Sequence, residues 1–330
     1  MSRIPSVHDT FLRAILADKQ IAVDYFKASL PDFVKEKLNF STLTQQTDSY
    51  VSHELKKTLS DIVYSCQRND GKRPVKVSLL IEHKSYIDKR APIQIGSYIF
   101  SGLLKQVSNK EEPSLIIPIL LYHGPKRWEY KTLGNLFADL EPTFGKFIPD
   151  FEYIYHNLGE IDDEQIRKLN NKFLVASLLA MKHSLVKSEL ETLIPEILSM
   201  TQGVNKNLQS NLIVYIFVTS GLEEQRIVAI LETLPLTIKE TVMSTLDIFV
   251  EKGKRIGREE GLAEGRVKGI AEGKAEGKAE GFAEGKKKNA EKVVRNLIRV
   301  STLTDEQIAS VAEVQVEYVT QMRADISRSN

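Results

Sequence analysis

Two carboxylates and one lysine lie at the ends of two neighbouring apolar runs. Asp61 stands in the run 59–65, and Glu82 and Lys84 close the run 77–84. An Asp-Gly step in the polar stretch between the runs favours a tight reversal of the chain. The sequence therefore predicts two adjacent antiparallel strands that bring Asp61 and Glu82 together at one end of a sheet.

The spacing of Glu82 and Lys84 suits metal-assisted hydrolysis. Side chains two residues apart on a strand point to the same face, so Glu82 and Lys84 project together and His83 points away. A small number of carboxylate oxygens suits Mg²⁺, which keeps several of its waters. We expect Asp61 and Glu82 to bind Mg²⁺, and Lys84 to orient an attacking water and offset charge on a phosphate.

Each of these residues also has a purely structural explanation. Asp61 can cap a strand or pair with an arginine, and Glu82 and Lys84 can form an ordinary surface pair. The apolar run before Glu82 argues against a surface pair, because a carboxylate buried there is costly unless a cation shares the site. His83 fits a structural role better than that of a ligand.

The arrangement resembles the PD-(D/E)XK nuclease superfamily, with Asp61 in the place of its first acid and Glu82-His-Lys84 in the place of its (D/E)-X-K motif. Over nearly the whole chain, the sequence is more closely similar to the Rpn family of recombination-promoting nucleases. Further stretches carry that resemblance: 8–11 (His-Asp-Thr-Phe), 94–98 (Gln-Ile-Gly-Ser-Tyr), 121–124 (Leu-Tyr-His-Gly) with Trp128, and a glycine-periodic segment near the end.

The resemblance implies a Mg²⁺-dependent DNA endonuclease of low sequence specificity, linked to recombination or mobile elements. Ser60 replaces the proline of the superfamily motif, a position that varies and that catalysis does not need. A non-catalytic DNA-binding or assembly protein on a nuclease-like core is the alternative. A transposase with three widely spaced acids fits less well, because it does not require a lysine two residues after Glu82.

Accessory residues follow from the same resemblance. The superfamily often places an acid in the first helix, where Asp9 and Asp18 are available, and Gln94 and Tyr98 match a motif in which the glutamine helps position metal or substrate. Structural alternatives remain, since Asp9 can cap the first helix and residues four apart share a helix face in any case. His123, at the end of an apolar strand, fits a turn better than a second catalytic centre.

Composition indicates a cytoplasmic protein without a membrane span. The 330 residues allow two or more domains, and 42% of them are hydrophobic, which suffices for a core. A single cysteine, Cys66, excludes a disulfide framework and a cysteine-rich zinc site, so a reducing compartment is expected. The first residues lack a hydrophobic signal core, and no run reaches membrane-spanning length.

The nearly balanced charge, 45 Lys and Arg against 44 Asp and Glu, means that contacts with DNA must be local. Cations near a metal site can hold phosphates without reading bases, which predicts weak sequence specificity and strong salt dependence. Each cation can equally belong to a solvated turn. The candidates for contacts with the DNA backbone are Lys72, Arg73, Lys76, Lys89 and Arg90, with Lys126 and Arg127 after the next strand.

Hydrophobic periodicity predicts an α/β fold with a restriction-endonuclease-like PD-(D/E)XK core, a helical subdomain and a glycine-periodic helical tail. Helices are expected at 8–28 and 91–107, strands at 115–122 and 151–158, and a polar stretch at 41–49. The predicted regions are 1–162 for the core, 163–250 for the helical subdomain, 251–289 for the glycine-periodic segment, and 290–330 for a small helical end.

Glycine recurs at every fourth residue from 257 to 285. Each glycine costs a helix roughly 0.8 to 1 kcal/mol against alanine, so a lone helix here is expected to be marginal and the segment flexible. A bare stripe permits close approach of another helix, so 257–285 is either a self-association segment or a spacer of variable length. Beyond it, Thr304 and Gln307 form a predicted capping box that begins a small docking bundle.

Overall fold

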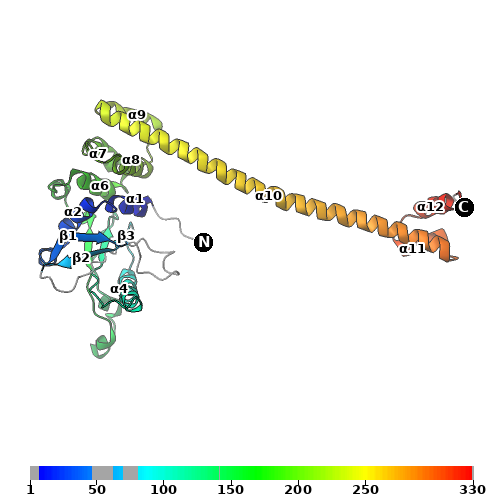
Figure 1. Cartoon of the computed structure of the whole chain (residues 1–330), viewed down its shortest axis with the longest axis horizontal. Helices are drawn as coiled ribbons and strands as arrows, with labels where there is room; N and C mark the ends of the chain where they lie inside the picture. Colours follow the sequence, from blue (N-terminus) through cyan, green and yellow to red (C-terminus); the bar gives the residue numbers. More distant parts are fainter. Residues whose placement is uncertain (1–6, 47–61, 70–80, 141, 329–330) are drawn as a thin grey trace. The chain divides into compact units, whose positions relative to one another are not determined.

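The computed structural model describes residues 7–46, 62–69, 81–140 and 142–328, with the backbone alone at 81–83 and 142. It shows a mixed α/β protein that is mostly helical and contains two small sheets (Figure 1). The chain divides into two compact units, Met1–Phe249 and Val250–Asn330. Within the described ranges, none of the helices combines the length and the apolar character needed to cross a membrane.

The expected helix at 8–28 is two helices, α1 (Val7–Leu16) and α2 (Lys19–Ser29). Asp18 separates them and caps α2, because its carboxylate accepts hydrogen bonds from the backbone N–H groups of Gln20 and Ile21. Asp9 lies inside the first turn of α1, so the alternative in which Asp9 caps the first helix is wrong. A short helix, α3 (Asp32–Lys35), follows.

The first sheet pairs β1 (Leu38–Gln45) with β2 (Tyr64–Arg68) in antiparallel fashion. The prediction of a polar stretch at 41–49 misses β1, because serine and threonine mask its alternation. Leu38 and Leu43 are nevertheless buried, and the hydroxyls of Thr44 and Ser65 lie 2.8 Å apart across the pair.

The second sheet is parallel, in the order β3 (Ile81–Lys84), β4 (Ile119–Tyr122) and β5 (Ile154–Asn157). Helix α4 (Ala91–Ser108) lies between β3 and β4 along the chain, as a parallel crossover requires. In the described part of the chain, β2 and β3 belong to different sheets, so these strand residues do not form the predicted hairpin. Residues 59–61 and 77–80 of the two apolar runs lie outside the described residues.

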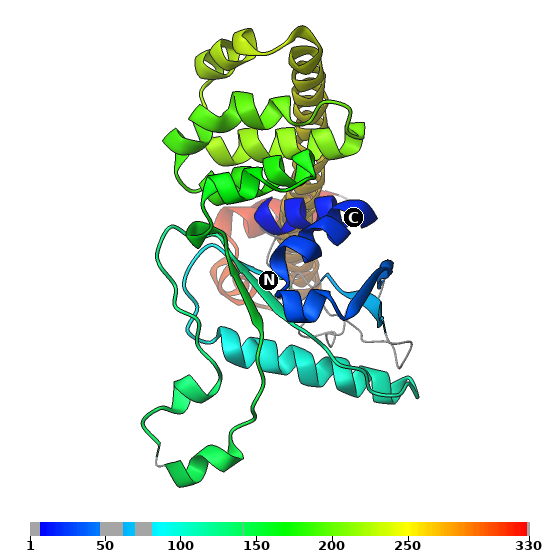
Figure 2. The same ribbon diagram turned by 90° about the vertical axis from the view of Figure 1, so that its left-hand side faces the viewer.

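The two faces of the parallel sheet bury different clusters. Ile119 and Leu121 belong to the large core together with α1, α2 and α6, whereas Leu120 and Tyr122 pack with residues of α4. Figure 2 shows α4 on one side of these strands and α1 and α2 on the other. The carboxyl edge of the sheet therefore lies between two layers of helix.

The helical stretch after β5 shares its core with the N-terminal helices. Its elements are η4 (Leu158–Glu160), α5 (Asp163–Arg167), α6 (Lys172–His183), α7 (Lys187–Ser199), α8 (Lys206–Ser220), α9 (Glu224–Thr233) and the start of α10 (Leu236–Val300). Two short turns, η2 (Gly134–Phe137) and η3 (Pro142–Phe147), lie in the long connection from β4 to β5. Buried residues of α6, α7 and α8 join those of α1 and α2 in one cluster.

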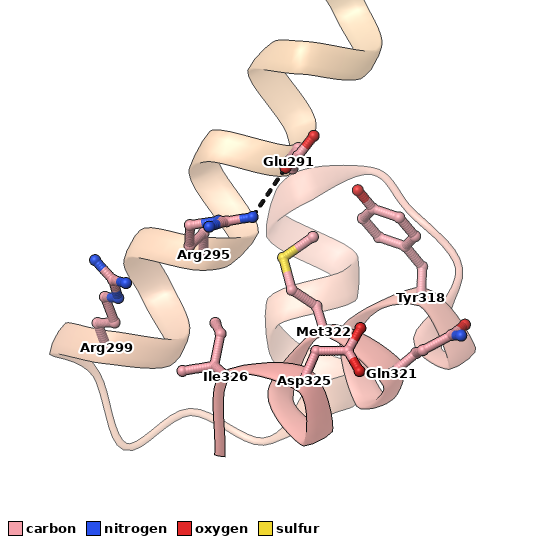
Figure 3. A pocket seen from close by; sticks show the side chains of 8 residues that line it. All are labelled: Glu291, Arg295, Arg299, Tyr318, Gln321, Met322, Asp325 and Ile326. Carbon is pink, nitrogen blue, oxygen red and sulfur yellow. Dashed lines mark hydrogen bonds and ion pairs between the residues drawn. The ribbon is translucent and has the colours of Figure 1, made fainter. Parts of the chain in front are cut away.

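The second unit contains residues 250–300 of α10, followed by α11 (Asp305–Ala312) and α12 (Val316–Arg328). The predicted capping box is confirmed, because Thr304 and Gln307 exchange backbone and side-chain hydrogen bonds. Residues 257–285 are helical throughout, and the alanine, glutamate and lysine residues between the glycines favour a helix, while the expected flexibility of this segment stays a prediction. A hollow of about 480 Å³ lies between the end of α10 and α12 (Figure 3).

Candidate functional site

The three parallel strands end together, and polar residues stand at that edge. In the sheet, Lys84, Tyr122 and Asn157 occupy one row, and the backbone N–H of His123 donates to the Lys84 carbonyl at 3.3 Å. Ligand sites of α/β proteins form at the carboxyl ends of parallel strands. The edge that carries Lys84 is therefore the candidate site.

The side chains of the predicted metal ligands lie outside the described part of the chain. Asp61 is not among the described residues, nor are Lys72, Arg73 and Lys76, and for Glu82 only the backbone position in β3 is described. Among the described side chains, no group of three or more His, Cys, Asp or Glu residues is arranged to hold a metal ion. The joint position of Asp61 and Glu82 remains a prediction.

Lys84 is a buried cation held by an unpredicted carboxylate. Its side chain is 7% exposed, and its Nζ donates to Asp88 Oδ2 at 2.9 Å and lies 5.5 Å from the centre of the Tyr86 ring. Burial alone would raise the pKa of Asp88, but hydrogen bonds from Lys84 and the Arg90 backbone N–H, with both positive charges, bring that pKa below its ordinary value. Asp88 is therefore an anion that fixes the ammonium group.

Asp88 is not among the predicted site residues, because its place in the sequence is typical of a turn before a helix. Its Oδ1 accepts from the Arg90 N–H at 2.9 Å, which is the usual role of an aspartate before a helix. Asp88 lies four residues after Lys84, and that spacing is the one feature of the sequence that could have indicated their contact. It brings the two side chains together only if the intervening turn folds back.

Helix α4 places Gln94 and Tyr98 on the sheet face to which Lys84 belongs. Lys84 and Tyr122 are neighbours in the register, so they point to the same face, and Tyr98 is buried against Tyr122 in one cluster. Gln94 is half-buried, and its Oε1 atom is buried with no hydrogen-bond partner within the described structure. An unsatisfied oxygen acceptor on this face suits a cation or a water.

A second polar cluster lies on the opposite face. The ring centres of His8 and His123 are 4.8 Å apart, and His8 Nδ1 lies 2.8 Å from the hydroxyl of Tyr215 in α8. Burial raises the pKa of Tyr215, so its hydroxyl stays protonated at neutral pH. The contact joins the stretches 8–11 and 121–124, and it supports a structural role for His123 in tying α1 to β4.

Gly124 follows His123 for a steric reason. A β-carbon at this position would collide with the ring and the hydroxyl of Tyr122, and that hydroxyl donates to the Lys126 carbonyl at 2.6 Å. The close approach of the tyrosine ring therefore favours glycine at position 124, directly after the strand end that carries the site.

The hollow in the second unit contains no comparable arrangement. It is lined by Glu291, Arg295, Arg299, Tyr318, Gln321, Met322, Asp325 and Ile326, and Arg295 pairs with Glu291 at 3.0 Å (Figure 3). Charges of both signs stand around an open depression, and no buried ion pair like that of Lys84 and Asp88 occurs among its described residues.

Comparison with known proteins gives one family. The profile of the family described as "Putative transposase, YhgA-like" matches residues 6–211. The chain is 26% identical over 223 residues to the recombination-promoting nuclease RpnD of Escherichia coli O157:H7, covering 66% of this chain and 83% of that protein. No solved structure gives a significant match.

Two relatives from Escherichia coli strain K12 carry contrasting names. The recombination-promoting nuclease RpnA is 24% identical over 194 residues, covering 54% of this chain and 66% of RpnA. The protein RpnE, named an inactive recombination-promoting nuclease-like protein, is 25% identical over 124 residues, covering 37% of this chain and 41% of RpnE.

Proposed function

Because the chain belongs to the YhgA-like family described as putative transposases, we propose that it is a nuclease that hydrolyses phosphodiester bonds of DNA in recombination or mobile-element processes. The names of RpnD and RpnA support this activity. The single observation that carries it is the position of Lys84, buried at the carboxyl edge of a parallel sheet two residues after Glu82.

The roles of the residues follow from their chemistry. Asp61 and Glu82 would hold a divalent cation such as Mg²⁺, and the unsatisfied Gln94 Oε1 fits the preference of such ions for oxygen donors and water. When bound, Mg²⁺ would lower the pKa of a coordinated water and polarise the phosphate. Lys84, held by Asp88, would donate to the attacking water or to a phosphate oxygen.

The proposal includes weak sequence specificity. Lys89 and Arg90 are exposed beside the site. Contacts from these cations to phosphates would position DNA without reading it, so binding should weaken steeply as salt rises.

Supercoiled plasmid tests the activity directly. We expect the full chain to nick or linearise plasmid with Mg²⁺ and to be inactive with EDTA. The variants Glu82→Ala and Lys84→Ala should each lose at least about 100-fold in rate, the effect of removing a group that stabilises developing charge. Thermal unfolding of each variant, measured in parallel, separates lost chemistry from lost folding.

The competing function is a DNA-binding protein without catalysis, and the name of RpnE makes it a specific alternative. Plasmid that stays intact with every metal and salt tried, while the protein still retards it in a gel, would favour that function. Cleavage that survives both substitutions would remove Glu82 and Lys84 from the mechanism.

We also propose that the segment 257–285 mediates self-association. All residues from 250 to 289 are exposed, and a β-carbon on any of the segment's glycines would meet nothing within 4 Å. A helix with so many bare positions gains stability when a second helix packs on them.

A further inference from the structure

A cavity of about 200 Å³ lies beside the Lys84–Asp88 pair. Three segments form it: the loop between β3 and α4 together with the first turn of α4, the chain after β4, and the residue before β5. The lining residues are Ile87, Asp88, Lys89, Pro92, Arg127, Trp128, Glu129, Lys131 and Tyr153. Two basic stretches that are far apart in the sequence, at Lys89 and Arg127, thus meet at one opening.

The aromatic walls of the cavity are held in place. Trp128 stands edge-on to Tyr122, with ring centres 5.0 Å apart, and its carbonyl accepts from the Tyr155 hydroxyl at 2.7 Å. The Tyr153 hydroxyl donates to the Lys131 carbonyl, also at 2.7 Å. Both residues are only 7% exposed, and these contacts fix the small part of each ring that borders the cavity before any ligand arrives.

The mouth of the cavity favours an anion. Lys89, Arg127 and Lys131 are exposed, and their side chains form no ion pair or hydrogen bond within the described structure. Of the two acids in the lining, Asp88 is already neutralised by Lys84. The remaining negative charge is that of Glu129, and it is outnumbered by the three positive charges. A ligand with an aromatic ring and a phosphate combines both requirements, and a nucleotide is such a ligand.

The size of the cavity limits what enters. Pockets for whole drug-sized ligands begin at about 300 Å³, so this one has room for a single base and not for a base pair. In a duplex each base is stacked and paired, and it must leave the helix to enter a pocket. An unpaired base can enter the pocket without first leaving a duplex.

We propose that this cavity binds one unpaired nucleotide of a DNA strand, with its base against Trp128 and Tyr153 and its phosphates at Lys89, Arg127 and Lys131. Asp88 belongs both to the cavity and to the ion pair of Lys84, so the bound nucleotide adjoins the phosphate that Lys84 addresses. The inference rests on the proposed nuclease function and adds a substrate class to it: single strands, or duplexes with an unpaired segment at the cleavage point.

Trp128 provides a direct test, because it is the only tryptophan of the chain. The full chain in EDTA is titrated with a short single-stranded oligonucleotide while tryptophan emission is followed. We expect saturable quenching, and about tenfold or tighter binding of the single strand than of the same strand annealed to its complement. Binding without any change in emission, or equal affinity for both forms, would overturn the proposal.

Variants at the cavity mouth test the contacts without touching its buried walls. Ile87→Asp places a carboxylate at the opening, and we expect it to weaken single-strand binding about tenfold or more. Arg127→Ala with Lys131→Ala should reduce the slope of log affinity against log salt by about 0.7 for each phosphate that the protein no longer neutralises. Lys146→Ala, an exposed lysine in η3 outside the cavity, is the matched control and should leave affinity and slope unchanged.

The outcomes separate this inference from the proposed function. Quenching by single strands, together with no cleavage of plasmid or of the single-stranded oligonucleotide in Mg²⁺, would leave the nucleotide site and remove the nuclease. Plasmid cleavage without strand preference, and with Ile87→Asp as active as the wild type, would leave the nuclease and remove the nucleotide site.

Discussion

Gln94 and Gln106 are two glutamines of one helix in different surroundings. The Gln106 Oε1 atom accepts from the N–H and the hydroxyl of Ser114, at 2.6 and 3.2 Å. The Gln94 Oε1 atom is also buried but accepts from no donor in the described structure. The Gln106 Nε2 atom is likewise buried without a partner in the described structure, so it is the position of Gln94 on the face of Lys84 that suggests a role for its amide in the proposed site.

We predict that Gln94→Met separates stability from activity. Methionine fills a similar volume and removes an unsatisfied oxygen, so the free energy of unfolding should stay within about 0.5 kcal/mol of the wild type or rise by about 1 kcal/mol. Plasmid cleavage should fall at least tenfold if the amide holds water or a cation. Urea unfolding and the plasmid assay measure the two effects.

The same substitution at Gln106 is the matched control. It leaves the Ser114 N–H without its acceptor but also removes the unpartnered Nε2 atom, so the free energy of unfolding should fall by up to about 1 kcal/mol. Cleavage per folded molecule should not change. Equal behaviour of both variants in the two assays would mean that Gln94 has no special role.

For single residues, the sequence predicts which side chains share a face of one element better than it predicts their partners from elsewhere in the chain. The prediction that Gln94 and Tyr98 share a face is confirmed, because helical spacing alone determines it. The ion pair between Lys84 and Asp88 depends on how one turn folds back, and the contact of His8 with His123 depends on tertiary packing. Neither turn geometry nor packing across the chain can be read from local spacing.

For helices and strands, the sequence predicts where periodic segments lie but not which strands pair with each other. The prediction of a helix at 91–107 is confirmed as α4, and the strands expected at 115–122 and 151–158 exist in shorter form as β4 and β5. The partner of each strand is decided by long-range burial. The described residues of β3 pair in parallel with β4 across a helical crossover, whereas the Asp-Gly step favours a local hairpin.

His156, in β5, makes the sheet sensitive to acid. Its Nδ1 atom lies 3.1 Å from the hydroxyl of Tyr25 in α2, and burial lowers its pKa from 6.5 to about 4. Between these pH values the unfolded chain binds the proton and the folded chain does not, so the free energy of unfolding falls as pH drops through this window. A difference of about 2.5 pKa units corresponds to about 3 kcal/mol.

We predict that His156→Gln removes this part of the pH dependence. Glutamine keeps a polar group for Tyr25 but does not titrate, so the variant should lose about 3 kcal/mol less than the wild type between pH 7 and pH 4. Urea unfolding at several pH values measures the difference. His183→Gln is the control, because it removes an imidazole from α6, where the ring contacts the carboxylates of Asp163 and Glu189 instead of Tyr25. Parallel pH curves for wild type and His156→Gln would contradict the assignment.

For the molecule as a whole, α10 presents a conflict between local propensity and structure. Eight glycines from 257 to 285 would cost an isolated helix about 6 to 8 kcal/mol against alanine. The helix is nevertheless continuous from Leu236 to Val300, and no side chain covers these glycines in the described structure. Propensity predicts the cost, but it cannot show whether a second chain offsets it.

We predict that Gly269→Ala, Gly273→Ala and Gly277→Ala together weaken self-association of the full chain at least tenfold. The added β-carbons meet nothing within the chain, so the single molecule should become more helical by circular dichroism. A second helix that packs on bare backbone would instead be pushed away. Sedimentation measures the association, and Gly253→Ala, outside the repeat, is the control. A chain ending at Val250 that sediments in the same oligomeric state as the full chain would eliminate association through this segment and leave the spacer.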